Sequence, residues 1–157
     1  MIDQIYTYFT IEMIFLWLNL GVLPFWLVLI IFPQSQICRV FIASIFPVLI
    51  LSLAYTYILY VLFNEGYDFL KNFELYLGLD SLGNLFADRS FLILFWSHFL
   101  AINLFCGAWI VKDSQKFGIN KVLMAFPLLI TYFIGPIGLT LYWIIRIFYA
   151  KRINLYD

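Results

Sequence analysis

The sequence has 157 residues, of which 65% are hydrophobic and 11% are charged, and its mean hydropathy is +0.99. These values lie outside the range of soluble domains and indicate an integral membrane protein. The formal net charge is zero, which gives no reason to expect a nucleic-acid partner or a polybasic membrane anchor. The cysteines, Cys38 and Cys106, lie in different apolar runs, so neither a disulfide framework nor a zinc site is indicated.

Four apolar runs are long enough to cross a hydrocarbon core of about 30 Å, which takes roughly 20 helical residues. In chain order they are residues 11–32, 40–63, 91–111 and 122–148. Open sheet edges cannot be satisfied in lipid, so the runs are predicted to be helices. We therefore expect an all-α integral membrane four-helix bundle that forms a single domain over residues 1–157. An even number of spans would place both termini on the same side.

The first run is predicted to be a retained helix, because no Lys or Arg precedes Arg39 to form the positive region of a secretory signal. It contains Asn19, Pro24 and Trp26, and a tight turn that starts at Pro33 leads into the second run.

The only long connection, residues 64–90, contains the stretch DFLKNFELYL. At helical spacing it has an apolar stripe with charged residues opposite. The stripe consists of Phe69, Leu70, Phe73, Tyr76 and Leu77. We interpret the segment as a short amphipathic helix that lies in the membrane interface between the second and third spans. The alternative is a lid that closes on a ligand entering from the bilayer.

The third run carries two polar side chains, His98 and Asn103, inside an apolar span, where polar groups hold helices together or serve function. Five residues turn a helix by roughly 140°, so the two side chains lie on different faces. Asn103 shares a face with Gly107, which would admit a close neighbour for a hydrogen bond. His98 is the only histidine. Three interpretations remain open for it: a neutral hydrogen-bonded imidazole, a general acid or base, or an axial metal ligand.

The fourth run is interrupted in its middle by Gly135, Pro136 and Gly138. Proline removes a backbone hydrogen bond and kinks a helix, and glycine lets another element or a flat ligand approach the backbone. Ordinary kinked packing is the alternative.

The orientation in the membrane is not determined by charge under this four-span scheme. The side of the termini holds five Lys and Arg, and the other side holds four. The first set is Lys71, Arg89, Arg146, Lys151 and Arg152, and the second is Arg39, Lys112, Lys116 and Lys121. We expect the two short loops to be cytoplasmic or stromal.

Three stretches together carry a resemblance to a known family. They are NLGVLPFWLVLIIFP (19–33), WSHFLAINLFCGAWIVKDSQKFGI (96–119) and PLLITYFIGPIGLTLYWIIR (127–146). The sequence resembles the abscisic-acid-deficient-four-like family, four-helix membrane proteins whose plant members are associated with neoxanthin synthesis from violaxanthin. The matching positions are Asn19, Pro24, Trp26, Pro33, Trp96, His98, Ala101, Gly107, Trp109, Asp113, Gly135, Pro136, Gly138, Tyr142 and Arg146. One departure is Asn103, where the family usually has Asp, and another is Ala108, where it has a larger polar or basic residue.

The resemblance implies an isomerisation in which an end-ring epoxide opens while the polyene loses a proton, giving an allene and a tertiary hydroxyl. This chemistry needs an acid and a base but no redox cofactor. His98, Asp113 and Arg146 are the implied catalytic residues. The implied ligand-binding residues are Asn19, Trp26, Asn103, Trp109, Gly135, Pro136 and Tyr142. The expected location is a thylakoid or plastid membrane, or a bacterial inner membrane.

A non-enzymatic function competes with this one. The chain would then be a pigment-binding or structural subunit of a photosynthetic membrane complex, in contact with photosystem or other membrane subunits. It would hold a carotenoid, or a chlorophyll whose magnesium is ligated by His98. An Asn in place of the family's Asp favours this alternative, because a carboxamide cannot act as a carboxylate base.

Overall fold

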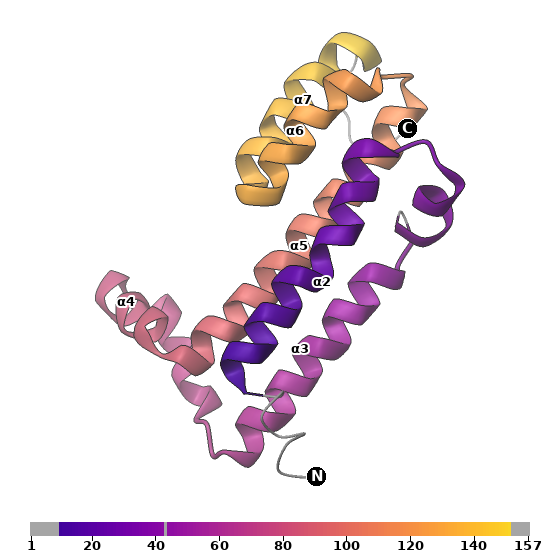
Figure 1. Ribbon diagram of the computed structural model, residues 1–157. Coiled ribbons are helices and arrows are strands. Elements are labelled where there is room, and N and C mark those ends of the chain that lie inside the picture. The colour runs from indigo at the N-terminus through magenta and orange to yellow at the C-terminus, as the bar shows by residue number, and fades with distance from the viewer. Residues whose placement is uncertain (1–9, 43, 152–157) are drawn as a thin grey trace, which may run out of the picture. The chain divides into compact units, whose positions relative to one another are not determined.

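The computed structural model describes residues 10–42 and 44–151, and within these ranges all regular structure is helical (Figure 1). The elements in chain order are α2 (Ile11–Ile31), the π-helix η2 (Cys38–Ile42), α3 (Phe46–Asn64), the 3-10 helix η3 (Phe69–Tyr76), α4 (Leu79–Ala87), α5 (Arg89–Lys116), α6 (Lys121–Phe133) and α7 (Gly135–Ala150). The prediction of an all-α chain is therefore confirmed for the described residues.

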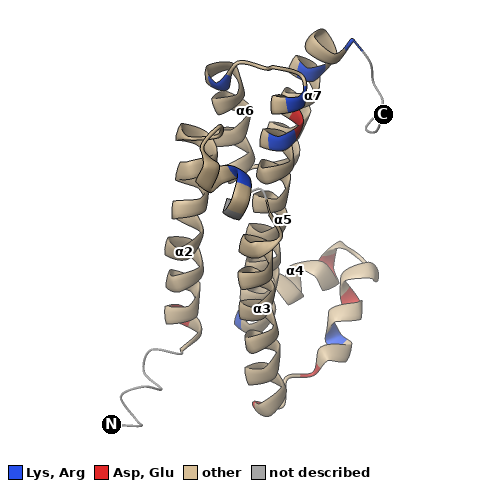
Figure 2. Ribbon diagram, turned by 90° about the vertical axis from the view of Figure 1, so that its right-hand side faces the viewer, with Lys and Arg blue, Asp and Glu red and all other residues tan. Residues whose placement is uncertain are grey.

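Three of the four predicted spans contain a helix long and apolar enough to cross a membrane, namely α2, α3 and α5. The second span begins later than predicted, because residues 40–42 belong to η2 and α3 starts at Phe46. The three helices contain 21, 19 and 28 residues, against roughly 20 needed for a crossing. Charged residues are scarce along α2 and α3, as Figure 2 shows. α5 is longer than the predicted run 91–111, because the polar residues up to Lys116 continue the same helix. These helices support a membrane location.

The fourth predicted span, residues 122–148, is not one helix, so the four-helix bundle is not confirmed. The backbone leaves helical geometry at Ile134, with φ −140° and ψ 83°. This break separates α6 from α7 along the chain, and the two helices lie side by side in space (Figure 1). Pro136, in the first turn of α7, has no N–H to continue the hydrogen bonding of α6. With 13 and 16 residues, the two helices are about 20 and 24 Å long, shorter than the hydrocarbon core.

The chain divides into two compact units, and α2, α3 and α5 each contribute residues to both. The first unit contains the described residues up to Leu20 together with Ile50–Leu100. Here the first half of α5 packs on the start of α2. The Trp96 indole donates a hydrogen bond to Asn19 Oδ1 at 3.2 Å, and its ring contacts Phe15 with centroids 5.7 Å apart. An exposed ion pair links Arg89 to Glu12 at 3.3 Å.

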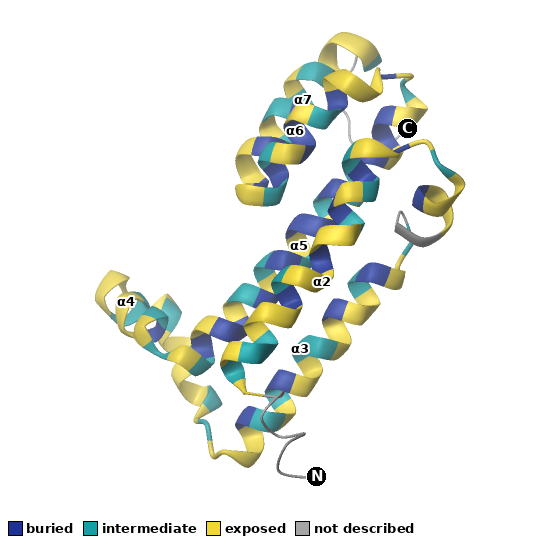
Figure 3. Cartoon of the chain, viewed as in Figure 1, coloured by how far each residue is buried: buried dark blue, intermediate teal, exposed yellow. Residues whose placement is uncertain are grey.

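The long connection of the first unit contains two short helices, η3 and α4, that pack against each other. Asp68 caps η3, because its Oδ1 accepts a hydrogen bond from the Leu70 N–H at 3.0 Å. Most of the surface of η3 and α4 is exposed (Figure 3). The exposed apolar side chains include Leu70, Phe73, Tyr76, Leu77 and Leu79. The predicted amphipathic segment is thus helical, and its unburied apolar stripe fits the proposed position in the membrane interface.

The second unit contains Gly21–Leu49 and the described residues from Ala101 onward. Gly107 of α5 allows α2 to approach, since a Cβ at this position would lie 2.7 Å from the Trp26 ring. This confirms the expected close neighbour of Gly107. Trp26 also contacts Tyr132 of α6 edge to face, with ring centroids 5.5 Å apart. The second half of α5 therefore packs on both α2 and α6.

The helices α6 and α7 form a helical hairpin within the second unit. The start of α6 lies at the end of α5, where Ser114 Oγ contacts Met124 Sδ. The second half of α7 lies at the same end of α5, where Arg146 pairs with Asp113. The start of α7, by contrast, lies against Asn103. Ten residues of α5 separate Asn103 from Asp113, which corresponds to about 15 Å of depth. The hairpin thus enters and leaves at the same end of α5.

This hairpin changes the predicted sidedness. With three crossings, the connection between α2 and α3 lies on the same side as everything after α5. That side carries six of the eight Lys and Arg that the structure describes, namely Arg39, Lys112, Lys116, Lys121, Arg146 and Lys151. Only Lys71 and Arg89 fall on the other side. Three crossings would not place both ends of the chain on the same side, as four would. That the short loops are cytoplasmic or stromal stays a prediction.

Candidate functional site

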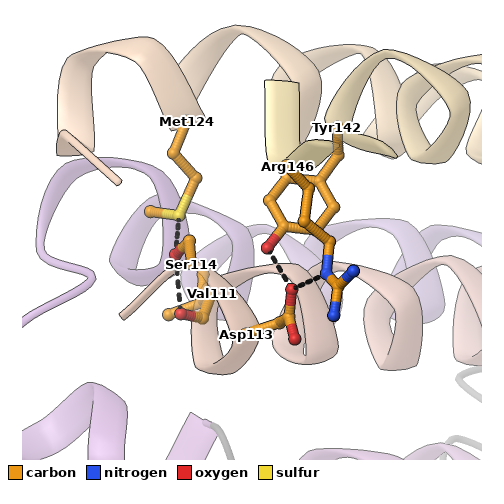
Figure 4. Close-up of polar contacts among 6 residues, drawn as sticks. All are labelled: Val111, Asp113, Ser114, Met124, Tyr142 and Arg146. Atoms are coloured by element: carbon orange, nitrogen blue, oxygen red, sulfur yellow. Dashed lines mark hydrogen bonds and ion pairs between the residues drawn. The ribbon is translucent and has the colours of Figure 1, made fainter. Parts of the chain in front are cut away.

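A buried polar cluster joins α5 to α7 in the second unit (Figure 4). Asp113 Oδ2 accepts two hydrogen bonds, one from the Tyr142 hydroxyl at 2.5 Å and one from the Arg146 Nε–H at 2.6 Å. Asp113 is 8% exposed, Tyr142 0% and Arg146 1%. The ion pair and the hydrogen bond from Tyr142 thus meet at one carboxylate oxygen in a buried, largely apolar surrounding. The cluster therefore brings a carboxylate, a phenol and a guanidinium together.

The Arg146 side chain is held by aromatic rings as well as by Asp113. Its guanidinium carbon lies 4.8 Å from the ring centroids of both Phe117 and Trp143. Such cation–π contacts are strongest where water is excluded. Within the described residues, Nη1 of Arg146 is buried and has no hydrogen-bond partner. The cluster therefore offers one donor to a further oxygen atom.

Local helix geometry explains how the sequence assembles this cluster. Tyr142 and Arg146 are four residues apart on α7 and so lie on one face. Asp113 is brought opposite them because Ser114, the next residue on α5, packs against Met124 of α6. The Ser114 hydroxyl also donates to the Val111 carbonyl at 2.7 Å (Figure 4).

Trp109, one turn before Asp113 on α5, covers the cluster on one side. Its ring contacts Tyr142 edge to face at 5.6 Å and stacks on Trp143 at 6.1 Å between centroids. Trp109 also lines a groove of about 370 Å³. The other lining residues are Ser44, Ile45, Val48, Phe105, Ala108 and Lys112. A volume in this range is typical of small-molecule sites. Trp109 therefore both lines the groove and contacts Tyr142 of the polar cluster.

Asn103 and Gly135 meet about 15 Å further along α5. Gly135 must lack a side chain, because a Cβ there would lie 3.1 Å from Asn103 Cγ and closer still to Oδ1. Asn103 is 4% exposed, and its Nδ2 has no partner among the described residues. The interhelical hydrogen bond expected from this Asn is therefore not found for Nδ2, and its neighbour is the start of α7. Pro136 follows as an exposed residue of the first turn.

Two other predicted ligand-binding residues have their polar or aromatic groups engaged by neighbours. In the first unit, Asn19 donates from Nδ2 to the Phe15 carbonyl at 2.7 Å and accepts from Trp96. Trp26 is buried against Gly107 and Tyr132 in the second unit. Both residues have clear packing functions, and their contribution to ligand binding stays a prediction.

His98 is not brought to the cluster. It belongs to the first unit and is exposed on α5, and more than four helical turns of α5 separate it from Asp113. It lies on the face of α5 whose apolar residues are also exposed. These residues are Leu92, Phe95, Ile102 and Phe105. A catalytic or metal-ligating function of His98 stays a prediction, but one that needs a partner from outside the described chain.

Sequence reasoning missed three contributors to the cluster, namely Phe117, Trp143 and Met124. Trp143 had a usable signal, since it lies three residues before Arg146, within reach on a helix surface. Phe117 and Met124 had none, because their positions depend on how the chain turns after α5.

Comparison with known proteins places the chain in a family. The family model described as ABA DEFICIENT 4-like matches residues 13–142. The chain belongs to the ABA DEFICIENT 4-like family. The match includes every predicted site residue except Arg146. This membership confirms the resemblance found from the sequence and supports a carotenoid-related membrane protein.

A curated member of the ABA DEFICIENT 4-like family gives a more distant comparison. The chain is 22% identical to the protein ABA DEFICIENT 4, chloroplastic, of Arabidopsis thaliana over 129 residues, which cover 80% of this chain and 57% of that protein. The chain thus spans little more than half the length of this chloroplast relative. No solved structure matches the chain.

Proposed function

We propose that this member of the ABA DEFICIENT 4-like family isomerises an epoxide-bearing end ring of a xanthophyll to the allenic alcohol. The observation that carries the proposal is the hydrogen bond of 2.5 Å between Tyr142 and Asp113. It joins a proton donor directly to a proton acceptor in a site from which water is largely excluded. Family membership supports the substrate class.

The reaction balances with these groups alone. The Asp113 carboxylate takes the proton from the polyene carbon next to the ring. The electrons of that C–H bond form the new double bond of the allene as the epoxide C–O bond breaks. Tyr142 gives its proton to the released oxygen, and the proton on Asp113 returns to the phenolate through their hydrogen bond. No electrons are gained or lost, so no redox cofactor takes part.

Arg146 has two functions in this proposal. Its Nε–H holds Asp113 in place, and its buried Nη1 is a donor for the epoxide oxygen. A fixed cationic donor stabilises the negative charge that develops as the C–O bond breaks. Substrate would approach from the groove, with the Trp109 indole moving aside and then covering the polyene.

A pair of tyrosine variants tests the proposal. In liposomes supplied with violaxanthin, Tyr142→Phe is expected to lower allenic product formation about 10²- to 10⁴-fold, the usual contribution of a positioned acid. Tyr149→Phe is the matched control, because Tyr149 is exposed on the same helix, and it should retain full activity. Unchanged activity of a folded Tyr142→Phe protein would remove the cluster from the mechanism.

A second function, pigment binding as a subunit of a membrane complex, is favoured by the exposed position of His98. An imidazole that faces lipid requires a polar partner or a metal ion. A chlorophyll magnesium or a neighbouring photosystem subunit would supply one. Purification in mild detergent distinguishes the two functions: a pigment in fixed ratio that is lost in His98→Ala supports this one, whereas colourless protein with isomerase activity supports the first.

The proposed location follows from the span helices and the relative. We place the protein in a thylakoid or other plastid membrane, or in a bacterial inner membrane, with the basic end on the stromal or cytoplasmic side. Cell fractionation followed by immunodetection would test this assignment.

A further inference from the structure

A hollow of about 530 Å³ lies between the starts of α2 and α5 in the first unit. Its apolar lining consists of Ile11, Phe15, Leu92, Ile93 and Trp96. The two remaining lining residues, Glu12 and Arg89, are charged. A volume in this range is typical of small-molecule sites, and the proposed isomerisation makes no use of this hollow.

The hollow is polar only at its mouth. Glu12 is the second residue of α2 and Arg89 is the first of α5, so both mark the membrane-interface end of these helices. Trp96 lies about two turns deeper on α5, some 10 Å from Arg89 along the axis, and its indole N–H is already hydrogen-bonded. The deep part of the lining is therefore apolar. Phe15 and Leu92 are exposed on its walls, so a hydrocarbon chain can enter sideways from the bilayer.

The ion pair at the mouth is accessible. Arg89 Nη1 lies 3.3 Å from Glu12 Oε1, and the two side chains are 82% and 69% exposed. Because so exposed an ion pair contributes little to stability, it can open to admit another charged group. The pair thus places one positive and one negative group side by side above an apolar hollow.

We propose that the hollow binds one chain of a zwitterionic phospholipid whose headgroup carries a phosphate and a primary ammonium, as in phosphatidylethanolamine. The phosphate pairs with Arg89 and the ammonium with Glu12, while the chain fills the hollow down to Trp96. A purely anionic headgroup would place its charge beside Glu12, and a purely cationic one beside Arg89. Because like charges in contact disfavour a partner, the pair selects a headgroup that has both charges.

Retention of lipid by the full chain tests this site. The protein in mild detergent is incubated with equal amounts of phosphatidylethanolamine and phosphatidylglycerol that have the same acyl chains. Native mass spectrometry then counts the molecules of each lipid that stay bound. We expect the wild type to retain phosphatidylethanolamine about tenfold more than phosphatidylglycerol, because the second headgroup exchanges an attraction to Glu12 for a repulsion.

Neutralising the two members of the pair should affect the two lipids differently. Glu12→Gln removes the repulsion, so it should raise retention of phosphatidylglycerol to about the level of phosphatidylethanolamine. Arg89→Gln removes the partner of the phosphate, so it should lower retention of phosphatidylethanolamine about three- to tenfold without raising that of phosphatidylglycerol. Both variants should fold, because the pair is exposed.

Asp80→Asn and Lys71→Gln are the matched controls. Each removes an exposed charge of the same unit that does not line the hollow, and each should keep the wild-type preference. Leu92→Trp tests the apolar part separately. It adds bulk at the exposed wall of the hollow, so it should lower retention of phosphatidylethanolamine while both charges stay in place.

Three results would overturn the proposal. The first is equal retention of the two phospholipids by the wild type, or a preference that changes as much in the controls as in Glu12→Gln. The second is a dimer without bound lipid in the same spectra, which would make a second copy of the chain the occupant. The third is retention of added zeaxanthin, an uncharged amphiphile, in place of both phospholipids. The proposal does not rest on the proposed function, and none of these results bears on the Asp113 cluster.

Discussion

The substitution Gly138→Ala distinguishes a helical hairpin from a single spanning helix by the sign of its effect. In a continuous helix, replacing Gly with Ala stabilises by about 1 kcal/mol. In the hairpin, a Cβ on Gly138 would lie 2.6 Å from Thr131 Cα and nearer still to the Thr131 N and Oγ1. Backbone atoms cannot turn away as a flexible side chain does, so α6 and α7 must separate.

The magnitude follows from two opposing contributions. Overpacking of a tight contact lowers the free energy of unfolding by about 1–3 kcal/mol. The higher helix propensity of Ala raises it by about 1 kcal/mol. We expect a net loss of about 1–2 kcal/mol for Gly138→Ala. For a chain of this length, that corresponds to a fall in Tm of roughly 2–8 °C.

Thermal unfolding in detergent, followed by circular dichroism, measures this effect. Gly21→Ala is the matched control, because a Cβ at that helical position has nothing within 4 Å, and it should raise Tm slightly. A Gly138→Ala protein whose Tm rises as in Gly21→Ala would refute the hairpin and would restore the single helix over residues 122–148.

Two further predictions concern the ion pair and the sidedness. Asp113→Leu should lower the free energy of unfolding by about 3–5 kcal/mol, because it leaves the Arg146 charge buried and unpaired. The double variant Asp113→Leu with Arg146→Met should recover most of that loss, as measured by thermal unfolding. In sealed vesicles, a membrane-impermeant maleimide should label Lys151→Cys and Asp80→Cys from opposite sides, whereas four spans would place them on the same side. Background labelling of Cys38 should be low, because it is 0% exposed and burial raises the pKa of its thiol.

The long spans were predictable because length and apolarity alone decide them. α2, α3 and α5 each cover most of a predicted apolar run, although α3 begins at Phe46, six residues after the start of the run 40–63. In lipid, a long apolar run can satisfy its backbone hydrogen bonds only as a helix. The hairpin was not predictable in this way. Pro24 lies inside α2 and Pro127 inside α6 without ending either helix. A proline in the sequence therefore does not by itself predict the break before Gly135. The break also depends on the close packing of Gly138 against Thr131.

The candidate site was predictable in its parts but not in its assembly. The spacing of Tyr142 and Arg146 places them on one helix face. Their partner Asp113 is 29 and 33 residues distant, and only the reversal at Ile134 brings it opposite them. The same reversal gives Asn103 the start of α7 as a neighbour instead of the interhelical hydrogen bond expected beside Gly107. Sequence periodicity describes single helices, whereas both contacts depend on a turn.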